Sequence, residues 1–272
     1  MFKKSNSFFN KYEKENELYN EVYNNNIIKI NSILNEANRK NIILNTNIKN
    51  KNGCFPLLFT VDNNNIEIVK LLIDYANKNN IILNRNDKEK EYGDYPLLSA
   101  TSNNNIEIVK LLMNYTDQKN IILTIDNNIN RSNPLLWVAD KNNVEMTKLI
   151  NDYANKNNII LDINSKETQY NQYPLIQAAI KNNVEIIKLL IEYANQKNII
   201  LKLDNNIDGR NPFSWADAYN NIEMVELLLD YATNNNIKLE LKESMLDSTI
   251  LVFHKKRKGL IKSISEIKTD II

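Results

Sequence analysis

Residues 53–76 read GCFPLLFTVDNNNIEIVKLLIDYA, and this stretch decides the fold because its pattern returns at regular intervals along the chain. A glutamate follows each proline after eleven residues, and a tyrosine follows it after nineteen. The prolines are Pro56, Pro96, Pro134, Pro174 and Pro212, and the steps in their numbering are 40, 38, 40 and 38. Self-similarity at a fixed period of this size indicates a repeat array. The sequence therefore predicts a solenoid, a class that builds extended binding surfaces.

Each unit divides into a turn and two helices. Pro56 fits the first turn of a short helix over 56–62, where a missing N–H costs little. Asn64 or Asn65 then caps a second helix by accepting a hydrogen bond from its free N–H groups. The apolar residues that follow recur at helical spacing in a wide stripe, which predicts a helix packed between two neighbours.

The place three residues before each proline calls for a residue that tolerates positive φ. Glycine holds it three times, at Gly53, Gly93 and Gly209, and glycine adopts this conformation without steric cost. Asn171 fills the same place in another unit, and asparagine tolerates positive φ better than most residues. Arg131 is the exception.

A second motif, Asn-Ile-Ile-Leu, follows the second helix in most units. It recurs at 41–44, 80–83, 120–123, 158–161 and 198–201. We expect these apolar triplets to anchor the chain as it leaves the second helix, and we expect the tyrosine before them to bury its ring with the hydroxyl at the edge.

The unit resembles an ankyrin repeat. Gly-x-x-Pro-Leu opens it, and Ile-Glu-Ile-Val-Lys-Leu-Leu at 66–72 and 106–112 is similar to the second helix of that family. Small residues lie on the first helix at Ala100, Ala139, Ala178, Ala179 and Ala216. The resemblance covers about residues 17–240. It implies an all-α, ankyrin-like solenoid of stacked helix-turn-helix repeats with long connecting loops.

The chain departs from the family in two ways. Its units are longer than the family's usual repeat of about 33 residues, because successive prolines are separated by 40 or 38 positions. The threonine that the family has before proline is replaced by Phe55, Tyr95, Asn133, Tyr173 and Asn211, and the histidine two residues after proline is also replaced. We therefore expect the hydrogen bond between that threonine and histidine to be absent.

The resemblance divides the chain into four parts. Residues 1–14 are expected to form a flexible N-terminal tail, and residues 15–50 an N-terminal capping repeat without proline. Five ankyrin-like repeats with these longer periods follow over 51–240, and a degenerate capping repeat over 241–272 closes the array. Terminal repeats are atypical because one of their faces meets water.

The proline steps alternate between 40 and 38, which implies a double unit made of two successive repeats. Matching pairs at this two-repeat spacing are Tyr95 with Tyr173, Asn133 with Asn211, and Trp137 with Trp215. The array should therefore present two alternating kinds of surface. The two tryptophans are either packed between repeats, which we favour, or exposed on the first helix.

Composition limits the function. The formal net charge is +1, which gives no global electrostatic case for binding nucleic acid or an acidic membrane. Cys54 is the single cysteine, so no disulfide forms within the chain, and we expect an intracellular, mainly cytoplasmic protein. No signal peptide or transmembrane run is visible. His254 is the single histidine, and no Gly-rich phosphate loop occurs, so we expect no enzyme activity, metal or cofactor.

The resemblance implies a protein partner held by the concave face, which turn tips and first helices form. The positions that the family exposes there lie two, four and five residues before proline and six and seven after it. The candidates are Tyr92, Asp94, Ser132, Lys141, Tyr170, Gln172, Lys181, Arg210 and Tyr219. Aromatic and arginine side chains are frequent hot spots. The alternative is that these side chains only solvate the loops.

Two other functions stay open. The chain could recruit targets for a larger enzyme complex without activity of its own. The basic run Lys255-Lys256-Arg257-Lys258 could be a nuclear-import or nucleic-acid segment, although a charged face of the cap explains it better.

Overall fold

The structure is a computed structural model that describes residues 2–125 and 127–237 and, among these, side chains from residue 11 onward. The C-terminal capping repeat expected over 241–272 and the basic run within it lie outside the described residues. The chain forms two compact units, Met1–Asp162 and Ile163–Ile272.

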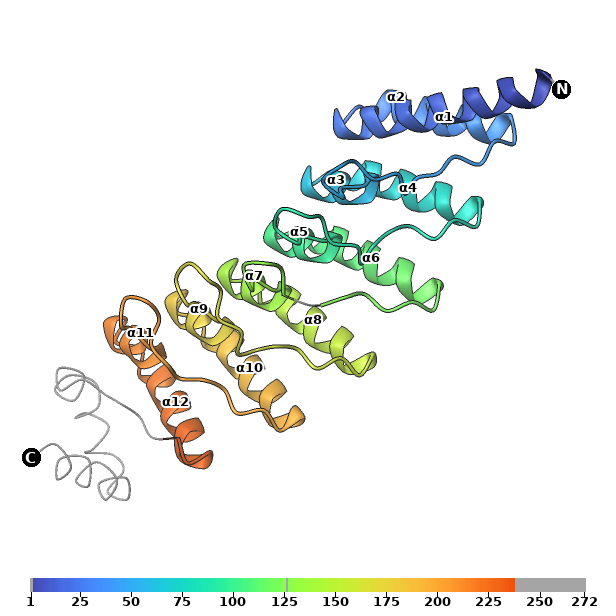
Figure 1. The fold of residues 1–272 in the computed structure, drawn as a ribbon. Coiled ribbons are helices and arrows are strands. Elements are labelled where there is room, and N and C mark those ends of the chain that lie inside the picture. The colour runs from blue at the N-terminus through green and yellow to red at the C-terminus, as the bar shows by residue number, and fades with distance from the viewer. Residues whose placement is uncertain (1, 126, 238–272) are drawn as a thin grey trace, which may run out of the picture. The chain divides into compact units, whose positions relative to one another are not determined.

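All described secondary structure is helical (Figure 1). The first unit contains α1 (Phe2–Tyr23), α2 (Ile27–Arg39), α3 (Pro56–Asp62), α4 (Ile66–Lys78), α5 (Pro96–Ser102), α6 (Ile106–Gln118), α7 (Pro134–Asp140) and α8 (Val144–Lys156). The second unit contains α9 (Pro174–Ile180), α10 (Val184–Lys197), α11 (Pro212–Ala218) and α12 (Ile222–Asn234). From α3 onward, each pair is a short helix, which we call the first helix of its repeat, followed by a longer second helix. The predicted fold class, an all-α array of helix-turn-helix repeats, is confirmed.

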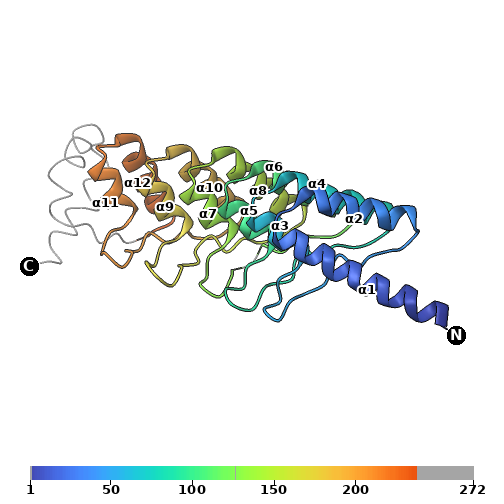
Figure 2. The ribbon, with the colours of Figure 1, turned by 90° about the horizontal axis from the view of Figure 1, so that it is seen from above.

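Neighbouring repeats pack through both layers of helices. First helices stack on first helices, α3 on α5 and α5 on α7 in the first unit and α9 on α11 in the second. Second helices stack likewise, α2 on α4, α4 on α6 and α10 on α12. The long loops before the first helices project to one side of the helices in each unit (Figure 2).

The first helix pair has no proline, as expected, but its boundary differs from the prediction. Helix α1 runs without a break from Phe2 to Tyr23, so no element boundary occurs at residue 14. It packs on α2 and α3, which gives it the place of a first helix. Leu18 and Val22 are almost fully buried there, which ties the C-terminal half of α1 to the array.

Asparagine replaces glycine at the helix ends. Asn64 after α3 and Asn80 after α4 have φ values of 55° and 54°. The same left-handed conformation follows helices at Asn25, Asn41, Asn104, Asn120, Asn142, Asn158, Asn182, Asn198, Asn220 and Asn236. Asparagine adopts this conformation more easily than other residues with a Cβ. Asparagine thus takes the place that glycine often has after the last turn of a helix.

A second asparagine begins each second helix. The Asn65 side chain accepts a hydrogen bond from the Ile68 N–H at 3.0 Å, so Asn65 is the cap, and Asn64 supplies the turn. The Asn65 amide also donates to the Asn25 Oδ1 of the preceding repeat at 2.9 Å. Equivalent bonds run from Asn105 to Asn64, Asn143 to Asn104 and Asn221 to Asn182. One asparagine pair thus links the helix starts of neighbouring repeats.

The repeated tyrosine links each repeat to the one before it. The Tyr115 hydroxyl accepts from the Leu83 N–H at 3.0 Å and donates to the Ile81 carbonyl at 3.1 Å. Tyr75 makes the same two bonds to Leu44 and Ile42, and Tyr231 makes them to Leu201 and Ile199. The predicted buried ring with a hydroxyl at its edge is confirmed. The partner of each tyrosine is the Asn-Ile-Ile-Leu segment of the preceding repeat. Only the leucine of this segment is fully buried, whereas its second isoleucine is at least half exposed.

The residue before proline has two roles that alternate as the two-repeat period predicts. Tyr95 and Tyr173 are fully buried and make no cap bond to their helices. Asn133 and Asn211 instead accept hydrogen bonds from the N–H groups of Leu136 and Ser214, which caps α7 and α11. This difference lies inside the repeats rather than on their surface.

All five turn positions have positive φ, including Arg131 at 59° and Asn171 at 53°. A side chain at this position has two costs, backbone strain at positive φ and crowding by neighbouring atoms, and Gly93 and Gly209 differ only in the second. A Cβ on Gly93 would lie 3.2 Å from the Ile129 backbone N, whereas a Cβ on Gly209 would meet nothing within 4 Å.

We therefore expect Gly93→Ala to destabilise the fold more than Gly209→Ala. Both variants place a side chain at positive φ, which costs about 1–2 kcal/mol, and crowding adds about 1 kcal/mol or more at Gly93 alone. Urea unfolding followed by circular dichroism measures both. Equal losses would show that backbone strain alone decides the effect.

Candidate functional site

The candidate surface consists of the loop tips and the exposed face of the first helices. Residues three, six and seven positions after proline share this face, because neighbours on a helix surface are three or four residues apart. The loop tips lie immediately before the same helices. The site can therefore be built separately in each unit.

The loop tips are each held by one acceptor side chain. The Glu89 carboxylate accepts hydrogen bonds from the N–H groups of Glu91 and Asp94 and also from that of Tyr92. Glu167 holds its own loop in the same way. In the alternate repeats an asparagine takes this place, at Asn50, Asn128 and Asn206. The two-repeat period thus selects the side chain that fixes each loop.

In the second unit, Trp215 is the centre of a surface cluster. The Arg210 guanidinium lies 4.7 Å from the Trp215 ring centroid, and the Tyr219 ring stacks on it at 6.2 Å with an angle of 26°. Tyr219 is 44% exposed, and its hydroxyl donates to the Ile180 carbonyl at 2.8 Å. Trp215 itself is half-buried, which lies between the two alternatives of a ring packed between repeats and a ring exposed on the first helix. The structure therefore brings two predicted candidates, Arg210 and Tyr219, together on one ring.

The other candidates of the second unit differ in access. Tyr170 is 47% exposed at a loop tip, and Lys181 is exposed at the end of α9. Gln172 is half-buried and bonds to the Gln177 side chain, so much of its polar surface is already used. Tyr170 and Lys181 are thus more exposed than Gln172.

In the first unit, Trp137 takes the place that Trp215 has in the second. It is half-buried, and the Lys141 ammonium lies 5.5 Å from its ring centroid. Ser132, predicted to face a partner, is only 8% exposed, and its backbone N–H is bonded to the Asn128 side chain inside the turn. Ser132 therefore does not fit the expected role of an open contact residue.

Phe59 is a third aromatic residue at the position of Trp137 and Trp215, and it was not predicted from the sequence. It lies one two-repeat period before Trp137, at the same place on its first helix. The Tyr19 and Tyr23 rings meet it edge-on, with centroids 5.7 and 5.2 Å away. The double period that linked the two tryptophans could have found Phe59. Ser99 and Gln177, with polar side chains, take this position in the intervening repeats.

Carboxylates surround the Phe59 cluster. Desolvation and the charges of Asp94 and Glu89 raise the pKa of the Asp62 carboxyl to about 6, against an opposing hydrogen bond with Ser99, although the residue as a whole stays exposed. A hydrogen bond to Glu91 raises the pKa of the exposed Tyr92 hydroxyl, as do the nearby charges of Glu91, Glu89 and Asp94. The loop tip and α3 therefore share a negative potential.

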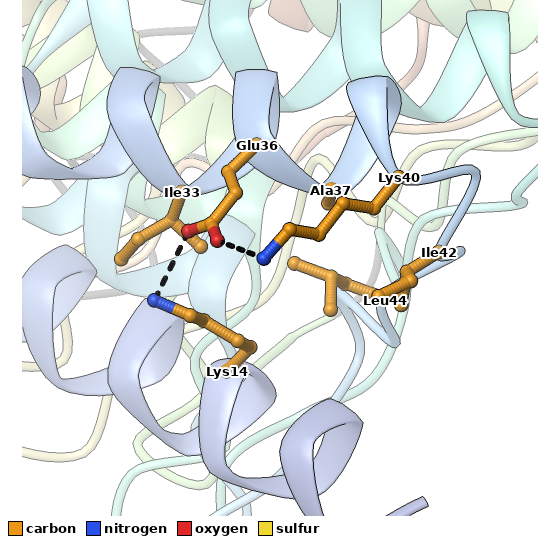
Figure 3. A pocket seen from close by; sticks show the side chains of 7 residues that line it. All are labelled: Lys14, Ile33, Glu36, Ala37, Lys40, Ile42 and Leu44. Atoms are coloured by element: carbon orange, nitrogen blue, oxygen red, sulfur yellow. Dashed lines mark hydrogen bonds and ion pairs between the residues drawn. The ribbon is translucent and has the colours of Figure 1, made fainter. Parts of the chain in front are cut away.

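A small hollow between α1 and α2 is lined by charged side chains that pair with one another (Figure 3). Glu36 contacts the Lys14 ammonium at 3.2 Å and the Lys40 ammonium at 2.5 Å. Hydrogen bonds to Lys40 and Lys14 lower the pKa of the Glu36 carboxyl. The hollow is part of the joint between two helices.

Other kinds of site find little support among the described residues. Over 2–125 and 127–237, no group of three or more histidine, cysteine or carboxylate side chains is placed to hold a metal ion. Within the same ranges, every helix is too short or too polar to cross a membrane. Cys54 is half-buried, and burial raises the pKa of its thiol, as do the charges of Glu89, Asp62 and Glu91.

The fold defines a helical repeat protein of the solenoid class. The family model for ankyrin repeats matches residues 18–122 and 157–239. The chain belongs to the ankyrin repeat family, as the sequence predicted. No protein with a curated function matches it.

Solved structures agree on the fold. An ankyrin repeat domain from Acinetobacter baumannii AYE is 18% identical, with a TM-score of 0.56, over 79% of this chain and 97% of that one. The ankyrin repeat protein EF0377 is 22% identical, with a TM-score of 0.53, over 78% and 96%. The ankyrin repeat domain of human ASB11 is 17% identical, with a TM-score of 0.52, over 79% and 82%. At these identities the likeness concerns the fold alone.

Proposed function

We propose that this chain is a non-catalytic protein-binding module whose contact surface is formed, in each unit, by the loop tips and the exposed face of the first helices. One observation carries the proposal. In alternate repeats the first helix presents a partly exposed aromatic ring, Phe59, Trp137 or Trp215. Each ring has a cationic or aromatic neighbour on the same surface. Partly desolvated aromatic and arginine side chains are the types that dominate binding energy in protein interfaces.

The environment of Trp215 supports a binding role. Its indole N–H has no hydrogen-bond partner among the described residues. An unsatisfied buried donor costs free energy, and few are retained in native structures. Because this donor is covered in the free chain, a carbonyl group of a partner would satisfy it once a covering side chain moves aside.

The ankyrin repeat family is generally one of interaction modules, which supports a protein as the partner. The function as a recruiting subunit and the intracellular location stay predictions from the sequence. The nuclear or nucleic-acid function depends on residues 255–258, outside the described part of the chain.

The test starts with affinity capture from the source organism, using the full chain as bait, and continues with the purified partner. We expect Arg210→Ala/Tyr219→Ala to weaken binding of that partner by more than about tenfold, because both side chains cover Trp215. The matched control, Lys202→Ala/Glu226→Ala, changes two exposed side chains of the same unit outside this surface. If the control variant loses binding and the first variant keeps it, the contact surface lies elsewhere.

A further inference from the structure

In the first unit, aromatic and acidic side chains share one surface, which we call the acidic aromatic face. It consists of Tyr23, Phe59, Asp62, Tyr92 and Asp94. Tyr23 and Asp62 occupy equivalent places at the ends of α1 and α3, and the Tyr23 ring meets Phe59 at 5.2 Å. Asp94 precedes the next first helix, which packs on α3.

The aromatic members of this face are open to contact. Tyr23 is 61% exposed and Tyr92 is 50% exposed. Phe59 is half-buried, and its ring contacts that of Tyr23. The faces of such rings attract cations, and the attraction is about 0.5–1 kcal/mol at exposed sites.

The carboxylates near this face lack ion pairs within the described part of the chain. No salt bridge of the described residues involves Asp62, Glu91 or Asp94, whereas exposed carboxylates of the second helices, such as Glu107 and Glu145, pair with lysines of neighbouring repeats. The Asp94 carboxylate accepts one neutral hydrogen bond, from the Asn128 amide at 3.0 Å. Charge complementarity therefore calls for a cation from outside.

We propose that the acidic aromatic face binds an extended, arginine-rich segment of a partner protein. This inference rests on the proposed function and names the partner chemistry for the first unit. Arginine fits better than lysine because its planar guanidinium both stacks on rings and bonds carboxylates with two N–H groups. Adjacent first helices lie about 8–10 Å apart, and three residues of extended chain span about 10 Å. One arginine in every three residues thus matches the spacing of successive repeats.

The probe is a fluorescein-labelled peptide of four Arg-Gly-Gly units, compared with Glu-Gly-Gly and Ser-Gly-Gly peptides of equal length. Fluorescence anisotropy with the full chain should show binding of the arginine peptide alone, weakening as salt rises. Asp62→Asn/Asp94→Asn should reduce its affinity about tenfold, and Phe59→Leu, which leaves the charge unchanged, about threefold. Asp74→Asn removes an exposed carboxylate from α4 of the same unit and should change affinity less than about twofold.

Three results would overturn the inference. One is equal binding of the glutamate and arginine peptides, and another is an equal loss with Asp74→Asn. The third is self-association of the chain that Asp62→Asn/Asp94→Asn abolishes, since the face would then belong to a second copy. Thermal unfolding of each variant separates lost binding from lost folding. If the captured partner still depends on Arg210 and Tyr219 while the arginine peptide fails to bind, the proposed function stands and this inference falls.

Discussion

Tyr115→Phe is expected to lower the free energy of unfolding by about 2 kcal/mol, although it removes only one oxygen atom. The Tyr115 hydroxyl accepts from the buried Leu83 N–H and donates to the Ile81 carbonyl. Without it, the backbone donor of Leu83 stays buried and unsatisfied, and water cannot reach it because Leu83 is fully buried. Removal of one partner from a buried pair costs more than the net value of the bond.

Urea unfolding of both proteins gives this difference. Tyr12→Phe is the matched control, because Tyr12 is 60% exposed and lies in the same unit. Its change should be within about 0.5 kcal/mol. If the two substitutions have equal effects, the tyrosine hydroxyl does not join neighbouring repeats in the way the distances indicate.

Glu89→Gln is the second change with a large expected effect, a loss of about 2 kcal/mol. Glu89 is 9% exposed, and its two carboxylate oxygens accept three backbone hydrogen bonds. Glutamine keeps one acceptor oxygen, but its amide nitrogen would face a backbone N–H of the loop, donor against donor. The loop tip that carries Tyr92 and Asp94 should therefore loosen. The exposed Glu13, replaced by Gln, is the control.

The effect of Glu89→Gln should depend on pH. Burial raises the pKa of the Glu89 carboxyl, but the backbone hydrogen bonds lower it more, so that the net shift is downward. A lowered pKa in the folded state adds stability above the unfolded pKa, and this stability is lost as pH falls through the folded value. The difference between wild type and Glu89→Gln should thus be largest near about pH 7 and shrink below about pH 4. A difference that is constant with pH would contradict the role of the ionised carboxylate.

The repeat architecture was predictable because its signals are local. Proline at the start of the first helix, glycine at the turn and an apolar stripe on the second helix each act within a single repeat. Even Arg131, the exception at the turn position, adopts the predicted positive φ, because the loop geometry is set by its neighbours. Asparagine at left-handed helix ends and at helix caps is part of the same local signal.

The candidate site was predictable only in part. Register identified Tyr92, Arg210 and Tyr219 as surface residues, and the structure places them there. The register of the repeats could not show that Ser132 is buried inside its turn, or that Gln172 bonds to the Gln177 side chain. It also missed Phe59, because phenylalanine on a helix is taken for a core residue until its ring contacts are known.

The sequence by itself determined the repeat, its two-repeat period and the type of each helix end, because these depend on backbone conformations that a few residue types favour. Only the tertiary structure decided which side chains stay open. Exposure depends on what the next repeat places against a side chain, and the next repeat lies a full period away along the chain. Tyr95 is therefore buried while Tyr92, three residues earlier, is half exposed.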